Sequence, residues 1–318
     1  MFSSLCRATF TMKTHCFGRN FCVSSFPLVR VPLPSRMETH LWYILPDEVS
    51  SASILNQYQD LLSPFEKENV LRMRGDEMKK RALLARALVR TTIARYQINP
   101  QVSARSLKFR KNIHGKPEVE WQLDADWSSP PMHFNISHTS SLIACGITVD
   151  SSIGIDVEEK QRTVKNNILS FARRYFSHQE VEHLTSISDP EVQRQEFIKL
   201  WTLKEAYVKA LGRGFSAAPF KTFSIQSRAS ISPISNSEAS EIVVESLDSS
   251  TNLTSNWQFG LLELESSHFA AICTEKNNAC EGSTGNIPRK LTVWKTIPFV
   301  EDTCVSGTDL VKMIGGLT

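Results

Sequence analysis

The segment from Gly154 to Glu158 reads Gly-Ile-Asp-Val-Glu, and it constrains the fold more than any other stretch of the 318-residue chain. Its alternation predicts a β-strand, because successive side chains of a strand point to opposite faces. Ile155 and Val157 would then face a core, whereas Asp156 and Glu158 would face the other way together. Two adjacent carboxylates repel each other unless a cation lies between them, and such oxygen ligands suit Mg²⁺. The segment is either a metal-binding strand or a polar edge strand with two solvated acids.

A long helix is predicted to follow. Asp189-Pro190 is a typical helix start, and Gly212 is a typical helix stop. Within this helix Trp201, Glu205 and Lys209 lie four residues apart and so share one face. A carboxylate and an ammonium so placed suit a metal ion and its phosphate ligand. An exposed Glu–Lys ion pair is the alternative, because it is the usual role of such a pair.

A third segment, Phe134-Asn135-Ile136-Ser137-His138, lies at the end of a predicted strand. Its Asn, Ser and His side chains can donate hydrogen bonds to phosphate oxygens. The alternative is turn chemistry, because Asn and Ser are common in turns, and His138 alone would more often be a structural histidine.

The composition narrows the classes of protein to consider. No run of about 18 apolar residues exists, so no membrane span is expected. The formal net charge of +3 argues neither for nor against nucleic acid, and neither a membrane nor nucleic acid is predicted as a partner. The seven cysteines form no Cys-x-x-Cys pair, so their spacing suits neither a zinc site nor a disulfide framework.

The first 36 residues form a compositionally distinct segment. They contain basic residues and several serines, but the first acid of the chain is Glu38. This composition predicts an organellar transit peptide over residues 1–36, and the alternative is a disordered basic tail. Met37 is also a potential start for a shorter, cytosolic form.

The other elements follow from apolar patterns and capping signals. Helices are predicted over residues 64–96, 163–175, from Ser177 onward and over 190–211, and strands over 41–45, 132–136, 142–149, 153–157, 257–264 and 268–273. The Ser-dense residues 224–255 are interpreted as hairpins with a long polar loop, and the chain after Thr274 as an irregular tail. Helix followed by strands occurs twice, which favours an α+β fold with two related lobes.

In combination and in this order, the three motifs resemble those of the 4′-phosphopantetheinyl transferase superfamily. Gly115-Lys116-Pro117 matches a fourth family element. The resemblance is to the large monomeric branch, typified by the surfactin-synthetase activator and the animal aminoadipate-semialdehyde-dehydrogenase enzyme, and it covers residues 41–273. It implies a monomer built as a pseudo-dimer of two α/β lobes with the active site in the cleft between them. The lobes would span residues 37–150 and 151–273, with residues 274–318 as the tail.

The resemblance also implies an activity. Such enzymes transfer 4′-phosphopantetheine from coenzyme A to a serine of an apo acyl carrier protein, releasing adenosine 3′,5′-bisphosphate with the help of Mg²⁺, or alternatively Mn²⁺. Asp156, Glu158 and Glu205 match the metal ligands, although some members lack the acid at the position of Glu158. Glu205 also matches the general base, acting directly or through water.

A set of polar residues is implied to hold coenzyme A through its phosphates: Arg74, Arg81, Lys111, His114, Lys116, Asn135, Ser137, His138, Lys204 and Lys209. Arg74 and Arg81 rest on the loosest alignment. Without the resemblance, their helix would be interpreted as a solvated cationic face.

Two other functions remain open alternatives. One is a non-catalytic scaffold that binds carrier proteins or coenzyme A, for which the complete acidic set would be unnecessary. The other is a Mg²⁺-dependent phosphohydrolase, which would need no acceptor protein. The first 36 residues favour the mitochondrial matrix, with the plastid or the cytosol as alternatives, and hence an acyl carrier protein of organellar fatty-acid synthesis.

Overall fold

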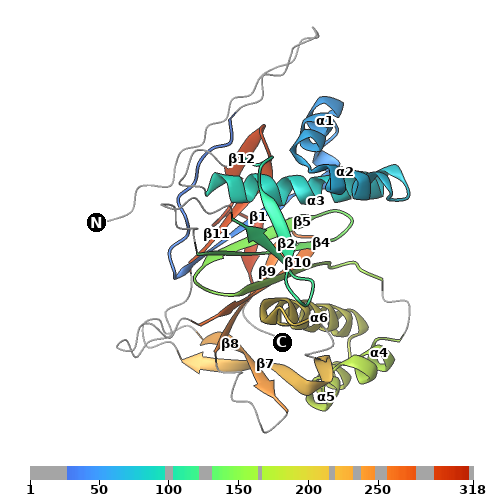
Figure 1. Cartoon of the computed structure of the whole chain (residues 1–318). Helices are drawn as coiled ribbons and strands as arrows, with labels where there is room; N and C mark the ends of the chain where they lie inside the picture. Colours follow the sequence, from blue (N-terminus) through green and yellow to red (C-terminus); the bar gives the residue numbers. More distant parts are fainter. Residues whose placement is uncertain are drawn as a thin grey trace.

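The computed structural model describes residues 27–96, 103–121, 131–163, 167–214, 219–231, 238–247, 256–276 and 290–314. Figure 1 shows two long helices, α3 and α6, with strands such as β5, β4 and β10 between them and the strands β7 and β8 below α6. The helices in the described residues are α1 Ala52–Leu61, α2 Pro64–Leu71, α3 Asp76–Arg95, α4 Ile168–Tyr175, α5 His178–Ser186 and α6 Pro190–Leu211. The strands are β1 Glu38–Ile44, β2 Lys108–Lys111, β3 Pro117–Glu120, β4 Met132–His138, β5 Ile143–Val149, β6 Ile153–Glu159, β7 Phe223–Ile231, β8 Glu238–Ser246, β9 Trp257–Leu264, β10 His268–Glu275, β11 Lys290–Ile297, β12 Glu301–Cys304 and β13 Val311–Met313.

The strands form two main sheets and two hairpins. One sheet has the order β12-β11-β1-β5-β4, and the other has the order β13-β9-β10-β6. The hairpins are β2-β3 and β7-β8. Each main sheet carries one long helix, so the chain forms two lobes of the same α+β kind, and the predicted fold class is confirmed.

Strand alternation distributes the apolar side chains among three buried layers. On β1, Trp42 and Ile44 pack in the cluster that includes α3, whereas Leu41 and Tyr43 pack in the cluster between the two sheets. On β6, the odd-numbered apolar residues 153, 155 and 157 also join the cluster between the sheets. Asp156 therefore faces the α6 side of its sheet, as the alternation of the sequence predicts.

Several predicted boundaries are confirmed. Helix α6 begins after Asp189, whose side chain accepts hydrogen bonds from two backbone amides, and ends at Gly212 in the left-handed conformation. Helix α5 begins at the capping box formed by Ser177 and Glu180. Both ends were readable because a side chain or a glycine satisfies helix groups that have no partner within the helix.

The predicted single helix over residues 64–96 is wrong. The chain forms α2, a break and then α3, which begins after Gly75 at φ +84°. A positive φ cannot continue an α-helix, and glycine adopts it without steric cost. Helix α4 begins after Asn167, later than predicted, and residues 164–166 lie outside the described part of the chain.

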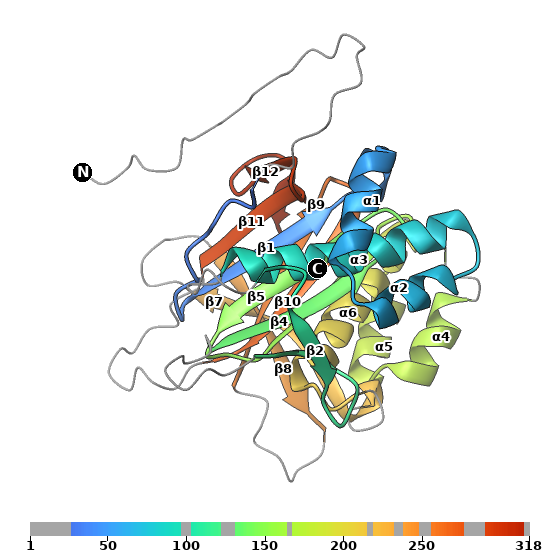
Figure 2. The same ribbon diagram turned by 45° about the horizontal axis from the view of Figure 1, so that its top comes forward.

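The prediction of an irregular tail after Thr274 is also wrong. Strand β11 pairs with β1 in parallel, and β13 pairs with β9, so each lobe gains a strand from the C-terminal end of the chain. Figure 2 shows β11 beside β1, although the two are far apart in the sequence. The reason is that β11 is only partly buried and mixes Lys and Thr with apolar residues without a regular alternation, which resembles an irregular polar segment.

The N-terminal boundary at residue 36 falls inside the folded part of the protein. The amide of Val31 donates to the carbonyl of Arg95 over 3.2 Å, and Val31 and Leu33 pack against the core of the first lobe. Arg36 forms an ion pair of 2.7 Å with Asp150. Residues 1–26, which carry most of the predicted transit peptide, lie outside the described residues.

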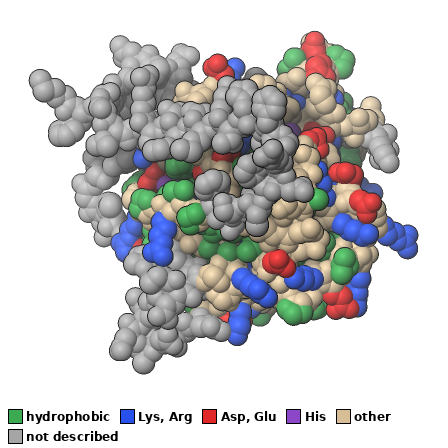
Figure 3. Space-filling model, turned by 90° about the horizontal axis from the view of Figure 1, so that it is seen from above, with side chains coloured by type: hydrophobic (Ala, Val, Ile, Leu, Met, Phe, Trp, Pro, Cys, Tyr) green, Lys and Arg blue, Asp and Glu red, His purple; other side chains and the backbone are tan. Residues whose placement is uncertain are grey.

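The surface charges, the apolar character of the helices and the cysteines can be compared with the expectations from the composition. On the face seen in Figure 3, acidic and basic side chains of the described residues are interspersed. Among the described residues, no helix is long and apolar enough to cross a membrane, and Cys145, Cys273 and Cys304 are free thiols.

The ion pair between α3 and β12 yields a stability prediction. Arg95 is fully buried and pairs with Asp302 at 2.7 Å, while its guanidinium lies 4.8 Å from the ring centroid of Trp42. Asp302→Ala leaves this buried cation without its carboxylate, so we expect the free energy of unfolding to fall by about 3–5 kcal/mol. Urea unfolding checks this. Glu301→Ala is the matched control at an exposed neighbour, and equal effects of the two substitutions would contradict the prediction.

Candidate active site

The two sheets meet where their edge strands β4 and β6 lie side by side. The side-chain carbonyl of Asn135 accepts the amide of Ile155 at 2.9 Å, and Oγ of Ser137 accepts the amide of Val157 at 3.2 Å. These two side chains replace the backbone hydrogen bonds that would otherwise join β4 to β6. We call this junction between the two edge strands the seam. Asn135 is 5% exposed and Ser137 is 6% exposed, so their first role is to join the lobes.

Asp156 occupies the middle of this seam. Its Oδ1 accepts hydrogen bonds from Oγ of Ser137 at 2.8 Å and from Nζ of Lys209 at 2.7 Å. Among the described residues, its buried Oδ2 has no hydrogen-bond partner. Burial raises the pKa of Asp156, and the ammonium of Lys209 opposes that shift. Within the described part of the chain, only one of the two carboxylate oxygens of Asp156 therefore has a hydrogen-bond partner.

Gly154 brings α6 to this carboxylate. A Cβ atom at this position would lie 2.0 Å from the carbonyl oxygen of Ala206 and 2.2 Å from the amide nitrogen of Ala210. The backbones of β6 and α6 are thus in direct contact, which only glycine permits. This contact places Glu205 and Lys209, from α6, beside the acids of β6.

Glu158 and Glu205 complete the acidic group. Burial and the neighbouring charge of Asp156 together raise the pKa of each to about 7. Arg162 forms an ion pair with Glu158 and acts in the opposite direction. The charges of Asp156, Glu158 and Glu205 therefore act on one another.

The donor chemistry of this group fits a divalent cation. It offers three carboxylates, and one of them has a buried oxygen that no described residue pairs, which suits hard cations with oxygen ligands. Among the described residues, no three His, Cys, Asp or Glu side chains are already gathered around one point as a metal site. Lys209 instead occupies one oxygen of Asp156.

Cationic residues from the first lobe adjoin the acids. Burial lowers the pKa of His138, and the charges of Lys209 and Arg81 lower it further. Arg81 on α3 therefore lies close enough for its charge to act on His138. Lys209 also acts on His138 and pairs with Asp156.

A cavity of about 610 Å³ opens beside His138. Apolar side chains including Leu107 and Phe109 line it together with cationic ones. Glu66 and Glu120 also line the cavity, and Glu66 pairs with Arg90. The basic lining residues are Arg86, Arg90, Lys108, Arg110, Lys111 and His138. Of these, only Lys111 and His138 were predicted. Arg86 could have been predicted, because it belongs to the cationic face of the long helix. Lys108 and Arg110 could not, because they lie in the β2-β3 hairpin, whose position only the fold reveals.

Lys204 does not reach the site. It is fully buried, and its Nζ lies 2.7 Å from Oε1 of Glu180 and 2.8 Å from the carbonyl of Phe223. Burial lowers its pKa to about 8, against the charge of Glu180. The prediction that Lys204 contacts the coenzyme does not fit this position, because the ammonium faces the core of the second lobe.

Three other residues predicted to bind coenzyme A, Arg74, His114 and Lys116, lie in different surroundings. Arg74 and His114 are exposed, Arg74 before the break at Gly75 and His114 at the tip of the β2-β3 hairpin. Nζ of Lys116 donates to the backbone carbonyls of Ile153 and Lys209. A phosphate contact by its ammonium would require breaking both hydrogen bonds.

These observations define a protein of two α+β lobes whose seam carries an acidic group flanked by cations. Comparison with known families identifies it further. The profile of the 4′-phosphopantetheinyl transferase superfamily matches residues 152–273, and that of the 4′-phosphopantetheinyl transferase N-terminal domain matches residues 50–148. The chain belongs to the 4′-phosphopantetheinyl transferase superfamily.

Similar curated proteins agree with this assignment. The chain is 30% identical over 187 residues to 4′-phosphopantetheinyl transferase Sfp of Bacillus subtilis, covering 58% of this chain and 75% of that protein. It is 25% identical over 222 residues to the human L-aminoadipate-semialdehyde dehydrogenase-phosphopantetheinyl transferase, covering 68% of this chain and 67% of that protein. A solved structure, holo-[acyl-carrier-protein] synthase of Thermotoga maritima, matches 40% of this chain and 64% of that chain at 24% identity with a TM-score of 0.27.

The contact at Gly154 yields a second prediction. Gly154→Ala forces α6 away from β6, so we expect a loss of about 1–3 kcal/mol or more in the free energy of unfolding. Thermal or urea unfolding measures the effect. Gly260→Ala is the matched control, because a Cβ there meets nothing within 4 Å. Equal stability of the two variants would show that β6 and α6 are not in backbone contact.

Proposed function

We propose that this chain transfers 4′-phosphopantetheine from coenzyme A to a serine of an apo acyl carrier protein, acting as a monomer of the holo-[acyl-carrier-protein] synthase type. The observation that carries the proposal is the group of Asp156, Glu158 and Glu205 beside Lys209, at the seam between the lobes. Family membership gives the class of reaction. The arrangement suits it, because phosphoryl transfer depends mainly on positioning and on neutralising charge.

The cavity beside His138 suits the nucleotide end of coenzyme A. Its apolar lining offers a surface for the adenine ring, and its cationic lining offers partners for phosphate groups. We assign His138 and Arg81 to the adenosine 3′-phosphate and Lys209 to the pyrophosphate.

Asp156, Glu158 and Glu205 would hold Mg²⁺ or Mn²⁺. When bound, such an ion supplies Lewis-acid stabilisation of charge on the phosphoryl oxygens. Oδ2 of Asp156, which no described residue pairs, is the oxygen that a cation would satisfy. Lys209 keeps Asp156 oriented through the hydrogen bond to Oδ1.

The acceptor serine must lose a proton as it attacks. Burial raises the pKa of Glu205 to about 7, and a general base works best when its pKa lies near the operating pH, so Glu205 is the carboxylate suited to take that proton. The serine oxygen bonds to the phosphorus that carries pantetheine, and the bond from this phosphorus to the bridging oxygen breaks. Adenosine 3′,5′-bisphosphate leaves with that electron pair.

Isosteric substitutions test the acidic group. Asp156→Asn and Glu205→Gln remove a charge but keep the side-chain shape, so we expect turnover to fall about 100-fold or more because transition-state charge is no longer balanced. The measurement is the mass increase of apo acyl carrier protein incubated with coenzyme A and Mg²⁺. Asp309→Asn, at an exposed position, is the control.

Wild-type turnover in either variant would remove these residues from the mechanism. A parallel incubation without acceptor separates transfer from hydrolysis. Release of adenosine 3′,5′-bisphosphate at the full rate without carrier protein would favour the phosphohydrolase. Treatment with a chelator, followed by Mg²⁺ or Mn²⁺, shows whether the metal is required and which ion serves better.

We also propose that the N-terminal segment directs the protein to the mitochondrial matrix, with the plastid or the cytosol as alternatives. The support is its acid-free basic composition. Since Val31 and Leu33 pack on the first lobe, the removable part is expected to end before them. A fluorescent fusion of the full chain should enter mitochondria, whereas one lacking residues 1–26 should stay cytosolic. Identical cytosolic distributions would refute the proposal.

A further inference from the structure

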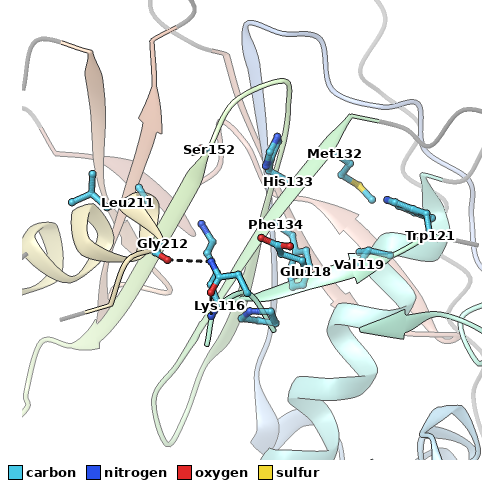
Figure 4. A pocket seen from close by; sticks show the side chains of 13 residues that line it. Lys116, Glu118, Val119, Trp121, Met132, His133, Phe134, Ser152, Leu211 and Gly212 are labelled. Atoms are coloured by element: carbon cyan, nitrogen blue, oxygen red, sulfur yellow. Dashed lines mark hydrogen bonds between the residues drawn. The ribbon is translucent and has the colours of Figure 1, made fainter. Parts of the chain in front are cut away.

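The β2-β3 hairpin of the first lobe holds the end of α6 in the second lobe. Nζ of Lys116 donates to the carbonyl of Ile153 at 2.9 Å and to the carbonyl of Lys209 at 2.9 Å. Nδ2 of Asn112 donates to the carbonyl of Gly212 at 3.1 Å. Figure 4 shows Lys116 near Gly212, and its dashed line is the hydrogen bond that Asn112 donates to the carbonyl of Gly212.

These bonds satisfy groups that a helix leaves without partners. The last four carbonyls of an α-helix have no donor within the helix, and they carry partial negative charge that favours a nearby cation. Lys209 lies in the last turn of α6. An ammonium from the other lobe therefore provides a favourable cap for this helix.

The hairpin is shaped to present this lysine. Oδ1 of Asn112 accepts the amides of His114 and Lys116, each at 2.9 Å. Gly115 has φ +90°, a conformation that favours glycine. The aliphatic part of Lys116 lies close to Gly212, where a Cβ would be 3.2 Å from Cδ. The turn of the hairpin and the side chain of Lys116 thus pack directly against the end of α6.

The two carbonyls that Lys116 binds belong to the two elements of the candidate site. Ile153 begins β6, the strand of Asp156, and Lys209 is the residue whose own side chain pairs with Asp156. One ammonium therefore ties the main chain of β6 to the main chain of α6. Burial lowers the pKa of Lys116 to about 8, as expected for a lysine enclosed between elements rather than on a solvated rim.

We propose that Lys116 is a positioning residue, which fixes the last turn of α6 against β6 so that Lys209 and Glu205 meet Asp156. It acts through these residues and does not contact the phosphates of the donor. The inference rests on the proposed function for its kinetic consequence. Its structural consequence is independent of that function, so the two can fail separately.

The structural test is amide hydrogen exchange on Lys116→Met, which keeps the aliphatic stem and removes the ammonium. We expect protection to fall at least tenfold in the last turns of α6, around residues 205–212, and to stay unchanged in α3. Lys116→Arg retains donors and should restore protection. Unchanged exchange in Lys116→Met, or a uniform loss across the whole second lobe, would overturn the proposal. Should Lys116→Met not fold, Lys116→Gln, which is polar but lacks the ammonium, provides the same comparison with Lys116→Arg.

The kinetic test separates positioning from direct binding. Because small misplacements of reacting groups cost up to about 100-fold in rate, we expect Lys116→Met to lower kcat about 10- to 100-fold with the KM for coenzyme A changed less than about twofold. Ile113→Ser, at the 95% exposed hairpin tip, is the matched control and should leave both constants unchanged. A raised KM with unchanged kcat would show that Lys116 binds the coenzyme, and would overturn the proposal. Absence of transfer by the wild-type protein would instead contradict the proposed function, leaving the exchange result to decide the role of Lys116.

Discussion

The hydrogen bonds from β6 to the side chains of Asn135 and Ser137 are the interaction on which the rest of the structure depends. Two sheet edges that meet side by side usually need either a shared backbone ladder or a covering element. Here two side chains of β4 accept the amides of β6, so the lobes join without becoming one continuous sheet. The junction leaves room on the α6 side of β6 for Asp156, and the acidic group exists because the seam is closed in this way.

The burial of Asp156 shows that this seam is not arranged for stability alone. Removing a carboxylate from water is costly unless its oxygens are paired. Lys209 and Ser137 satisfy one oxygen, but the other has no partner among the described residues. An asparagine would avoid the buried charge at the same size. Such an arrangement is expected where a ligand completes the set, since buried unsatisfied groups in native proteins concentrate at functional positions.

The sequence predicted the elements whose signals are local, and it failed where the decisive contacts are distant. The capping box at Ser177 and the alternation around Asp156 require only neighbouring residues, and both are confirmed. Strand β11 pairs with β1, which lies about 250 residues away in the sequence. Its own mixture of polar and apolar residues therefore gave no indication that it forms a strand beside β1. Glu205 and Asp156 were joined only through the order of family motifs, since neither spacing nor periodicity reveals that Gly154 lets α6 contact β6.

Lys204 and Lys209 of α6 have the same chemistry, but the geometry of the helix points them to different surroundings. Lys209 lies four residues after Glu205 and so shares its face, whereas Lys204 precedes Glu205 by one residue, about 100° around the helix. That rotation turns Lys204 toward Glu180 of α5 and the carbonyl of Phe223, which begins β7. The same helix therefore presents one lysine to the core of the second lobe and the other to Asp156. Adjacent positions of one motif can thus serve different purposes, because one residue step turns a side chain by about 100°.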